Sequence, residues 1–467
     1  MSALDAALGR ARPAKSRSKQ KRRRAKARAV STEYSLLLTA TLCLLAFGAV
    51  MVFSASSTTQ VLRNGGLADS AYYLQRTLLV GALGLVIMHF TARHGLLAIR
   101  RATPILLAGS LLLLVVVLGA GQSVNGATRW IGSGSFQIQP SELAKVALVL
   151  YAADLLAREP RRIRSIGGFM PILLVTGAAC LLVMLQPDMG TTMVIALAVG
   201  ATLIAAGVAP RDLGKIALVI GVAILLMTLI EPYRMARLTS FLHPGGDTEG
   251  AGFQAAQAKI ALGSGGLFGV GIGNGVQKAF YLPEAHTDMI SAVIGEELGL
   301  VGILGVVGLF GAFGFAGLRI AQKAKDDYGK ILVAGLTSMV LVTAMINLFA
   351  VMGLAPLTGV PLPFISYGNS ALLSCLFAVG LILNVARGGT ASVARGRGGE
   401  SRSARAGKGR SSRPGPSSGK LRVVEGGRSP ARDRSRTSGA RRAKSGGGGG
   451  GNRGARGARH GGRRRAP

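Results

Sequence analysis

Ten long runs of mostly apolar residues decide what this chain can fold into. A helix needs about 20 apolar residues to cross the hydrocarbon core of a bilayer, and the mean hydropathy of +0.42 fits several such segments. We therefore predict an all-α polytopic membrane protein with about ten transmembrane helices. The runs lie near residues 34–55, 75–92, 103–120, 140–157, 168–186, 189–208, 212–231, 289–318, 329–352 and 365–386.

The distribution of positive charge predicts how these helices are oriented. The net charge is +35, but most of the excess lies in two polar tails, residues 1–33 and 388–467. If the N-terminus is inside, the Lys- and Arg-bearing connections all fall on the cytoplasmic side, as the positive-inside rule requires. Both termini are thus expected in the cytoplasm, and a specific nucleic-acid partner is not indicated. Those connections are residues 93–102, 158–167, 209–215 and 319–328.

The two tails are expected to be disordered flanks of one membrane domain, residues 34–387. Residues 1–33 are polybasic, and residues 388–467 consist mainly of Gly, Ser, Arg, Pro and Ala. Neither tail has enough large apolar side chains to bury a core. Both could attract anionic lipid on the cytoplasmic leaflet. Alternatively, the first tail only anchors the topology and the last is only a solvated low-complexity segment.

One extracytoplasmic connection, residues 232–288 between the seventh and eighth runs, is too long to be a simple link. Loops of this length in a compact domain are usually functional. Its amphipathic parts predict short helices that lie on the membrane surface or re-enter it. The segment GLFGVGIGNG within it lacks the preceding strand of a dinucleotide-binding loop, so it is a weak match to a nucleotide site.

The end of this loop carries an unusual density of ionisable groups for so apolar a chain. Carboxylates near membrane depth persist mainly where they face a cavity, a partner or a substrate. Pro283 ends any helix that arrives from upstream, and Thr287 or Asp288 is predicted to cap the next one. Asp288 is then an ionised carboxylate at a helix start, and we predict that it acts as a base at the outer mouth of the membrane. The other ionisable groups here are Lys278, Glu284, His286, Glu296 and Glu297.

A second polar set lies at the outer end of the fourth run. Gln139, Glu142 and Lys145 follow one another at three-residue steps, which places them along one face of a helix. Arg129 and Trp130 precede them. The set either lines a substrate cavity or contains an intramembrane Glu–Lys pair that fixes helix packing.

Further polar residues stand near other outer ends. Arg234 and Arg237 are about one helical turn apart and suit a pyrophosphate through paired hydrogen bonds, although interfacial snorkelling is an alternative. Asp188 is predicted to cap the sixth run rather than to take part in chemistry. In the Gly- and Pro-rich segment before the tenth run, Ser366 is a candidate polar contact, together with Asn347 from the preceding run.

The order of these motifs resembles the SEDS family of peptidoglycan glycosyltransferases, which includes FtsW, RodA and SpoVE. The resemblance rests on RWIGxGxxxxQPSExxK, LQPDMGT, YRxxRLxxFLxP, YLPEAHTD, IGEELGLVG and GxxPxTGxxLPFxSYG, in that order over roughly residues 34–387. YLPEAHTD with NGVQK before it is closest to the division-type branch. The turn that often carries Lys in the family has Thr358 here.

The resemblance implies a membrane enzyme that polymerises lipid II into glycan strands, with Asp288 as the essential carboxylate. It also implies a class B penicillin-binding transpeptidase of the FtsI type and other divisome proteins as partners, and a place at the division septum. A divalent cation, Mg²⁺ or Mn²⁺, could assist. A lipid II flippase and an elongation-type polymerase are the alternatives. The expected substrate-binding residues are Arg129, Trp130, Gln139, Glu142, Lys145, Arg234, Arg237, Lys278, Glu284, His286 and Ser366.

Overall fold

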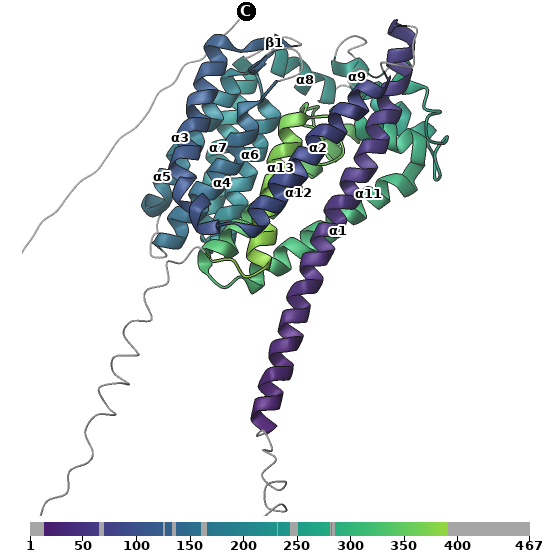
Figure 1. The fold of residues 1–467 in the computed structure, drawn as a ribbon. Helices are drawn as coiled ribbons and strands as arrows, with labels where there is room; N and C mark the ends of the chain where they lie inside the picture. Colours follow the sequence, from purple (N-terminus) through teal and green to yellow (C-terminus); the bar gives the residue numbers. More distant parts are fainter. Residues whose placement is uncertain are drawn as a thin grey trace, which may run out of the picture. The chain divides into compact units, whose positions relative to one another are not determined.

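All ten predicted runs are helices in the structure, a computed structural model (Figure 1). It describes residues 14–64, 70–124, 127–132, 137–159, 166–230, 232–242, 251–280, 282 and 285–390. The chain divides into two units, Met1–Gly396 and Arg397–Pro467, and everything described below lies in the first. The helices that correspond to the runs are α1 (Ala14–Asn64), α2 (Ser70–Arg93), α3 (Leu96–Ala120), α4 (Pro140–Arg158), α5 (Ile166–Leu185), α6 (Met189–Ala206), α7 (Pro210–Ile230), α11 (Ile290–Lys323), α12 (Asp327–Val351) and α13 (Asn369–Ala386).

Within the described residues, nine of these helices are long and apolar enough to cross a membrane. The tenth, α4, is less apolar because it carries Glu142, Lys145, Asp154 and Arg158, yet most of its side chains are buried among the other helices. Helices α12 and α13 form the middle of the bundle and are largely buried, whereas α7 stands at its edge with Thr228 as its buried residue. The polytopic, largely helical fold predicted from hydropathy is therefore confirmed.

The first helix differs from the prediction. Helix α1 begins at Ala14, so much of the expected irregular arm is helical in the structure, in keeping with the high helix propensity of its Ala, Lys and Arg residues. Residues 1–13 lie outside the described part of the chain. Arg387 donates to the Tyr34 hydroxyl at 2.6 Å, and Lys323 pairs with Glu33. The two ends of the membrane domain therefore meet at the same end of the bundle.

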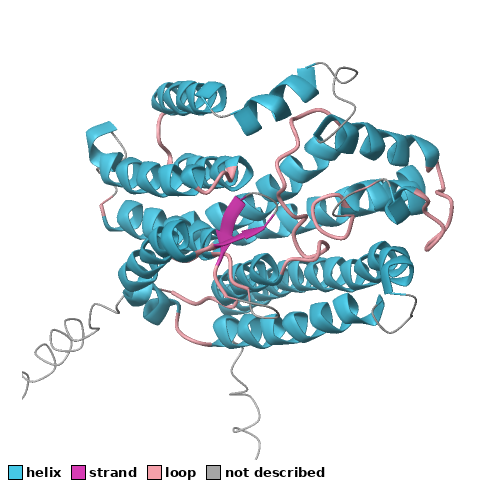
Figure 2. Cartoon of the chain, turned by 90° about the horizontal axis from the view of Figure 1, so that it is seen from above, coloured by secondary structure: helices cyan, strands magenta, loops and turns pink. Residues whose placement is uncertain are grey.

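The opposite end carries the short elements (Figures 1 and 2). It is called the outer end because the charge pattern predicts that it faces away from the cytoplasm. The long loop contains α8 (Pro232–Leu242), α9 (Ala251–Ser264) and α10 (Gln277–Phe280), so the prediction of short helices there is confirmed. One departure from an all-α fold is a two-stranded antiparallel ribbon of β1 (Gln122–Val124) and β2 (Ala127–Trp130).

Helix α11 is interrupted at Gly299, whose φ of 65° and ψ of −160° are not helical and suit only glycine. The glycine-rich segment 264–275 fills the break with its own backbone. The amides of Val270 and Gly271 donate to the carbonyls of Glu296 and Glu297 at 3.0 Å each, and Leu300 donates to Gly266 at 3.0 Å. The loop thus satisfies backbone groups that the helix leaves unpaired, which an apolar environment requires.

Candidate functional site

Asp288 lies in the turn 285–289 at the outer end and is partly exposed. The first helical residue of α11 is Ile290 and its N-cap is Met289, without a side-chain cap. The prediction that Thr287 or Asp288 caps this helix is therefore wrong. Instead, the Thr287 hydroxyl donates to Asp288 Oδ1 at 3.2 Å. The Asp288 carboxylate is therefore held by the turn and does not cap the helix.

Asn347 of α12 fixes the backbone on both sides of this carboxylate. Its Nδ2 donates to the carbonyl of Asp288 and to that of Val360, each at 2.8 Å, while its Oδ1 accepts from Ser291. Because Asn347 is buried, these bonds form in a low-dielectric setting where their loss is costly. The asparagine therefore ties the turn that carries Asp288 to the loop between α12 and α13.

Two arginines meet Asp288 around Gly359. A Cβ on Gly359 would lie 3.7 Å from Asp288 Oδ2 and 4.0 Å from the Nη1 atoms of both Arg129 and Arg237. Gly359 also has a φ of 69°, which favours glycine. The space beside this residue is thus bordered by one carboxylate and two guanidinium groups from three distant parts of the chain.

Each arginine is oriented by backbone carbonyls. Arg129, on β2, donates through Nε to Gln186 at 3.3 Å and through Nη2 to Pro187. Arg237, on α8, donates through Nη1 to the carbonyl of Leu357 at 2.8 Å. A guanidinium presents its donors in a fixed planar fork, and main-chain carbonyls hold that fork in place in both arginines.

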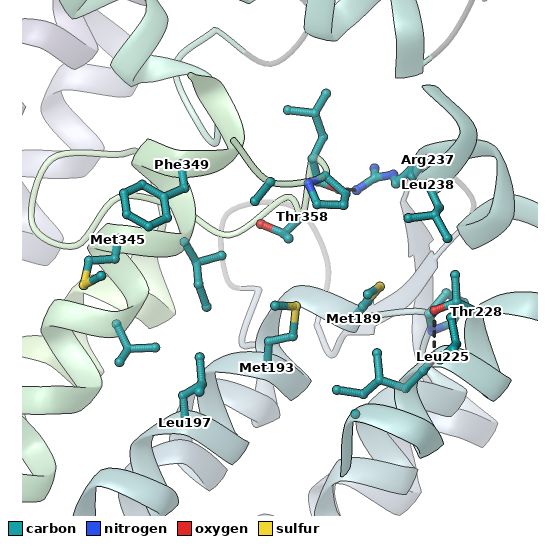
Figure 3. A pocket seen from close by; sticks show the side chains of 18 of the residues that line it. Met189, Met193, Leu197, Leu225, Thr228, Arg237, Leu238, Met345, Phe349 and Thr358 are labelled. Atoms are coloured by element: carbon teal, nitrogen blue, oxygen red, sulfur yellow. Dashed lines mark hydrogen bonds between the residues drawn. The ribbon is translucent and has the colours of Figure 1, made fainter. Parts of the chain in front are cut away.

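A groove of about 490 Å³ runs from these arginines along the bundle (Figure 3). Arg129, Arg237 and Thr358 border it near the outer end, and the rest of its lining is almost entirely apolar. The Thr358 hydroxyl is buried without a hydrogen-bond partner. Figure 3 shows the apolar side chains of α6 facing those of α12, with α7 beside them: Met189, Met193, Leu197, Leu225, Met345 and Phe349. The groove thus combines a cationic mouth with an apolar trench.

Lys278 does not contribute to this mouth. Its ammonium group is 2.5 Å from Glu297 Oε1 with neither side chain exposed, and it also donates to the Ser54 hydroxyl of α1 at 3.1 Å. The neighbouring Glu296 accepts from the amides of Val276 and Gln277 through Oε1. This buried ion pair argues against the expected substrate-binding role of Lys278.

The same correction applies to Lys145. It pairs with Glu142 at 2.8 Å, both side chains are buried, and Glu142 also accepts from Ser374 of α13 at 3.0 Å. The structure thus favours the packing role for this pair over a place in the substrate cavity. Gln139 precedes α4 and donates to Asp188 at 3.2 Å.

The remaining candidates fall into four groups. Asp188 caps α6 by accepting from the Thr191 amide at 3.0 Å, as predicted. Ser366 accepts from the Leu362 amide at 2.8 Å, which closes a turn, and Trp130 pairs with Gln122 in the ribbon; neither lines the groove. His286 packs against tyrosines. Glu284 and the side chain of Arg234 lie outside the described residues.

No cluster of three or more His, Cys, Asp or Glu side chains suited to a metal ion occurs in the described part of the chain. Mg²⁺ is often held by one or two carboxylates together with substrate phosphates. Asp288 and a substrate pyrophosphate would have to supply such ligands here. These residues do not form a metal site by themselves.

The family model described as cell cycle protein (FtsW/RodA/SpoVE) matches residues 34–390. The chain belongs to the FtsW/RodA/SpoVE family. It is 41% identical over 366 residues to a probable peptidoglycan glycosyltransferase FtsW of Trichlorobacter lovleyi, which covers 76% of this chain and 94% of that protein. It is 40% identical to the stage V sporulation protein E of Bacillus subtilis, with 75% and 96% covered.

Solved structures agree with membership of the FtsW/RodA/SpoVE family. One, from work on the structural coordination of polymerization and crosslinking by a peptidoglycan synthase complex, has a TM-score of 0.63 and 29% identity, and covers 75% of this chain and 96% of that one. The rod shape determining protein RodA of Thermus thermophilus has a TM-score of 0.56 and 27% identity, with 75% and 95% covered. The shared fold therefore spans the membrane domain.

Proposed function

We propose that this chain is a peptidoglycan glycosyltransferase that polymerises lipid II into glycan strands for septal wall synthesis during cell division. Similar proteins are named as probable enzymes of this kind. The observation that carries the proposal is the placement of Asp288, Arg129 and Arg237 around Gly359 at the mouth of an apolar groove. A base, two cations and a lipid-compatible trench are what this transfer needs.

The chemistry follows from these groups. Asp288 takes the proton from the acceptor sugar hydroxyl, which is a poor nucleophile until deprotonated. The oxygen attacks the anomeric carbon of the donor, and the bond from that carbon to the lipid pyrophosphate breaks with inversion. The negative charge that develops on the leaving pyrophosphate is stabilised by Arg129 and Arg237, which their carbonyl partners hold in advance.

The groove is the proposed binding site for the part of the lipid chain next to the pyrophosphate. Its apolar side chains are partly exposed at the side of the bundle, including Leu197, Leu225 and Met345. A polyprenyl chain could therefore lie in the groove near its head group and continue into the bilayer. This arrangement aligns the anomeric carbon with the base, which lowers the entropic part of the barrier.

The orientation and partners complete the proposal. The outer end faces away from the cytoplasm and both ends of the membrane domain lie inside, in line with the positive charge of the tails. A class B penicillin-binding transpeptidase of the FtsI type, with other divisome proteins, works beside the chain at the septum, and anionic lipid binds the basic tails. Support comes from the structural match to a peptidoglycan synthase complex.

The decisive experiment uses the full chain, purified with its transpeptidase partner and given labelled lipid II. Glycan ladders on a gel would support polymerisation. Movement of lipid II across a vesicle membrane without ladders would favour the flippase. The buried Glu142–Lys145 pair, which could have suited a transporter, is engaged in packing against Ser374 instead.

Replacing Arg237 with glutamine should lower kcat/KM for lipid II by about 10- to 100-fold, since a hydrogen bond to a charged group contributes about 1.5–3 kcal/mol. Arg237→Lys should fall in between, because lysine keeps the charge and loses the planar fork. Initial rates of strand synthesis measure both. The control is Arg211→Gln at the start of α7, which lies at the other end of the bundle from α8. An equal loss of kcat/KM in this control would contradict the role assigned to Arg237.

Filling the groove with Leu197→Trp should raise KM for long-chain lipid II about tenfold, since overpacking an apolar site costs about 1–3 kcal/mol. A substrate with a short prenyl chain should be affected less. Ile204→Trp lies two turns further along α6 on its exposed surface and serves as the matched control. Equal KM values for the two variants would place the lipid chain elsewhere.

A further inference from the structure

A compact group of aromatic rings lies at the outer end beside the turn that carries Asp288. The Tyr73 ring is 4.6 Å from the His286 ring, 5.0 Å from the Tyr367 ring and 5.4 Å from the Tyr72 ring, measured between centroids. The Arg76 guanidinium carbon is 5.9 Å from the centre of Tyr367 and 6.0 Å from that of Tyr72. We call these five side chains the tyrosine cluster.

The tyrosine cluster is held in place by polar bonds. Arg76 donates to the Tyr72 hydroxyl at 3.1 Å, and Asn369, with its side-chain oxygen turned toward the guanidinium, accepts from Nε and Nη2 of Arg76 at 3.0 Å. The Tyr367 amide donates to the His286 carbonyl at 3.0 Å. Little side-chain entropy therefore remains to be lost if a ligand binds here.

The cluster is accessible and stands apart from the groove. Tyr72 is 44% exposed, and the other four side chains are partly exposed. Their side chains come from α2, the turn 285–289 and the end of the loop before α13, and none of the five lines the groove. The groove is lined by α6, α7, α8 and α12, with Arg129 of β2 and residues 355–358 of the same loop. His286 belongs to the same turn as Asp288. The carboxylate thus adjoins two differently built surfaces, one cationic and apolar, the other aromatic with one cation.

A polymerase of lipid-linked sugars must hold two glycan substrates at one base. We infer that the tyrosine cluster is a saccharide-binding subsite that holds the sugar of the acceptor next to Asp288. This inference rests on the proposed function. The C–H faces of pyranose rings are apolar and stack on aromatic rings, while tyrosine hydroxyls and a guanidinium supply hydrogen bonds to sugar oxygens.

One physical detail favours this role over simple packing. The cluster couples a guanidinium to two tyrosine rings, and Arg is the cation best suited to both aromatic stacking and carboxylate binding. The alternative is an interfacial aromatic belt, in which Tyr72 only anchors α2 at the membrane surface.

The test measures saccharide binding separately from catalysis. The full chain in nanodiscs, carrying Asp288→Asn so that no transfer can occur, is mixed with the soluble disaccharide of N-acetylglucosamine and N-acetylmuramic acid. Tyrosine ring protons are saturated in otherwise deuterated protein, and transfer to the sugar protons is recorded by NMR. We expect clear transfer at millimolar sugar, and its absence would overturn the inference.

Variants then locate the site. Tyr72→Leu and Tyr367→Leu should weaken disaccharide binding at least fivefold and, in chains that retain Asp288, raise the acceptor KM more than they lower kcat. Tyr72→Phe and Tyr367→Phe, which keep the rings, should recover most of the binding. Phe90→Leu, an exposed ring further along α2, is the matched control. Binding that is unchanged in both leucine variants, or lowered equally by Phe90→Leu, would leave only an aromatic belt.

The same experiments keep the two proposals apart. Glycan ladders from the parent chain together with tyrosine-independent sugar binding would reject the subsite and leave the polymerase standing. Sugar binding that depends on Tyr72 and Tyr367, without any glycan ladders, would reject the polymerase and leave the subsite standing. Thermal unfolding of each variant shows whether a loss of sugar binding comes from the subsite or from a loss of fold. The ring-saturation experiment on the Asp288→Asn chain needs no tyrosine variant, so it tests the inference even if those variants do not fold.

Discussion

Asp288→Asn is expected to remove strand synthesis while the chain remains folded. The substitution keeps the shape of the side chain and its contact with Thr287, but an amide cannot take a proton. Loss of a general base lowers the rate by about 10²- to 10⁴-fold. Asp288→Glu should also be slow, because the longer side chain moves the carboxylate relative to Arg129 and Arg237. Ladder formation from labelled lipid II measures both variants.

The control for this experiment is Asp212→Asn at the start of α7, at the end of the bundle opposite Asp288. Its carboxylate lies 3.6 Å from Lys215 and does not line the groove. It should polymerise at the parental rate. Thermal unfolding of all variants excludes a loss of fold. If Asp288→Asn made strands at full speed, the enzyme assignment would fail, and a transporter or a scaffold for the transpeptidase would become the better reading.

The largest effect on stability is expected from breaking the Lys278–Glu297 pair. Lys278→Met leaves a carboxylate buried beside Ser54 without its cation, and Glu297→Gln leaves an ammonium group in the same position. Removing one partner of a buried ion pair costs about 3–5 kcal/mol. Both variants should therefore unfold at clearly lower temperature in detergent, as followed by circular dichroism.

The double variant Lys278→Met, Glu297→Gln separates charge from packing. It leaves no unpaired buried charge and should regain most of the stability lost in either single variant, since replacing a whole buried pair is often nearly neutral. Lys215→Met removes a partly exposed ammonium group from a longer ion pair and should change little. A double variant as unstable as the sum of the two single ones would show that the ion pair is not what holds these segments together.

The membrane helices could be predicted from sequence because their signal is local. Each run is apolar over the length of a bilayer, so α2, α3 and the other spans needed no knowledge of their neighbours. The cap on α6 was also predictable, since Asp188 directly precedes that helix. Helix α1 extends further toward the N-terminus than predicted. The positive charge of residues 14–33 indicates that they are not buried, but it does not prevent them from forming a helix.

The site was predicted less completely, because its geometry depends on pairings between distant segments. Lys278 and Glu297 are separated by a loop and a helix start, and nothing in either residue indicates that they pair. In the sequence, Gly299 is one of many glycines within an apolar run, and nothing nearby indicates that the helix breaks there. Gly359 lies in a turn with Pro356, a signal that can indicate a positive φ, but nothing local marks it as the place where three side chains converge.

The exchange of backbone bonds between the glycine-rich loop and α11 has a dynamic consequence. The amides at 270, 271 and 300 are bonded across the two segments rather than along one helix. Neither segment can open alone without leaving peptide groups unsatisfied, so the two open and close as one cooperative unit. The turn that carries Asp288 directly precedes the outer half of α11. A shift of the glycine-rich segment would therefore also move the outer half of α11 and, with it, the turn that holds the base.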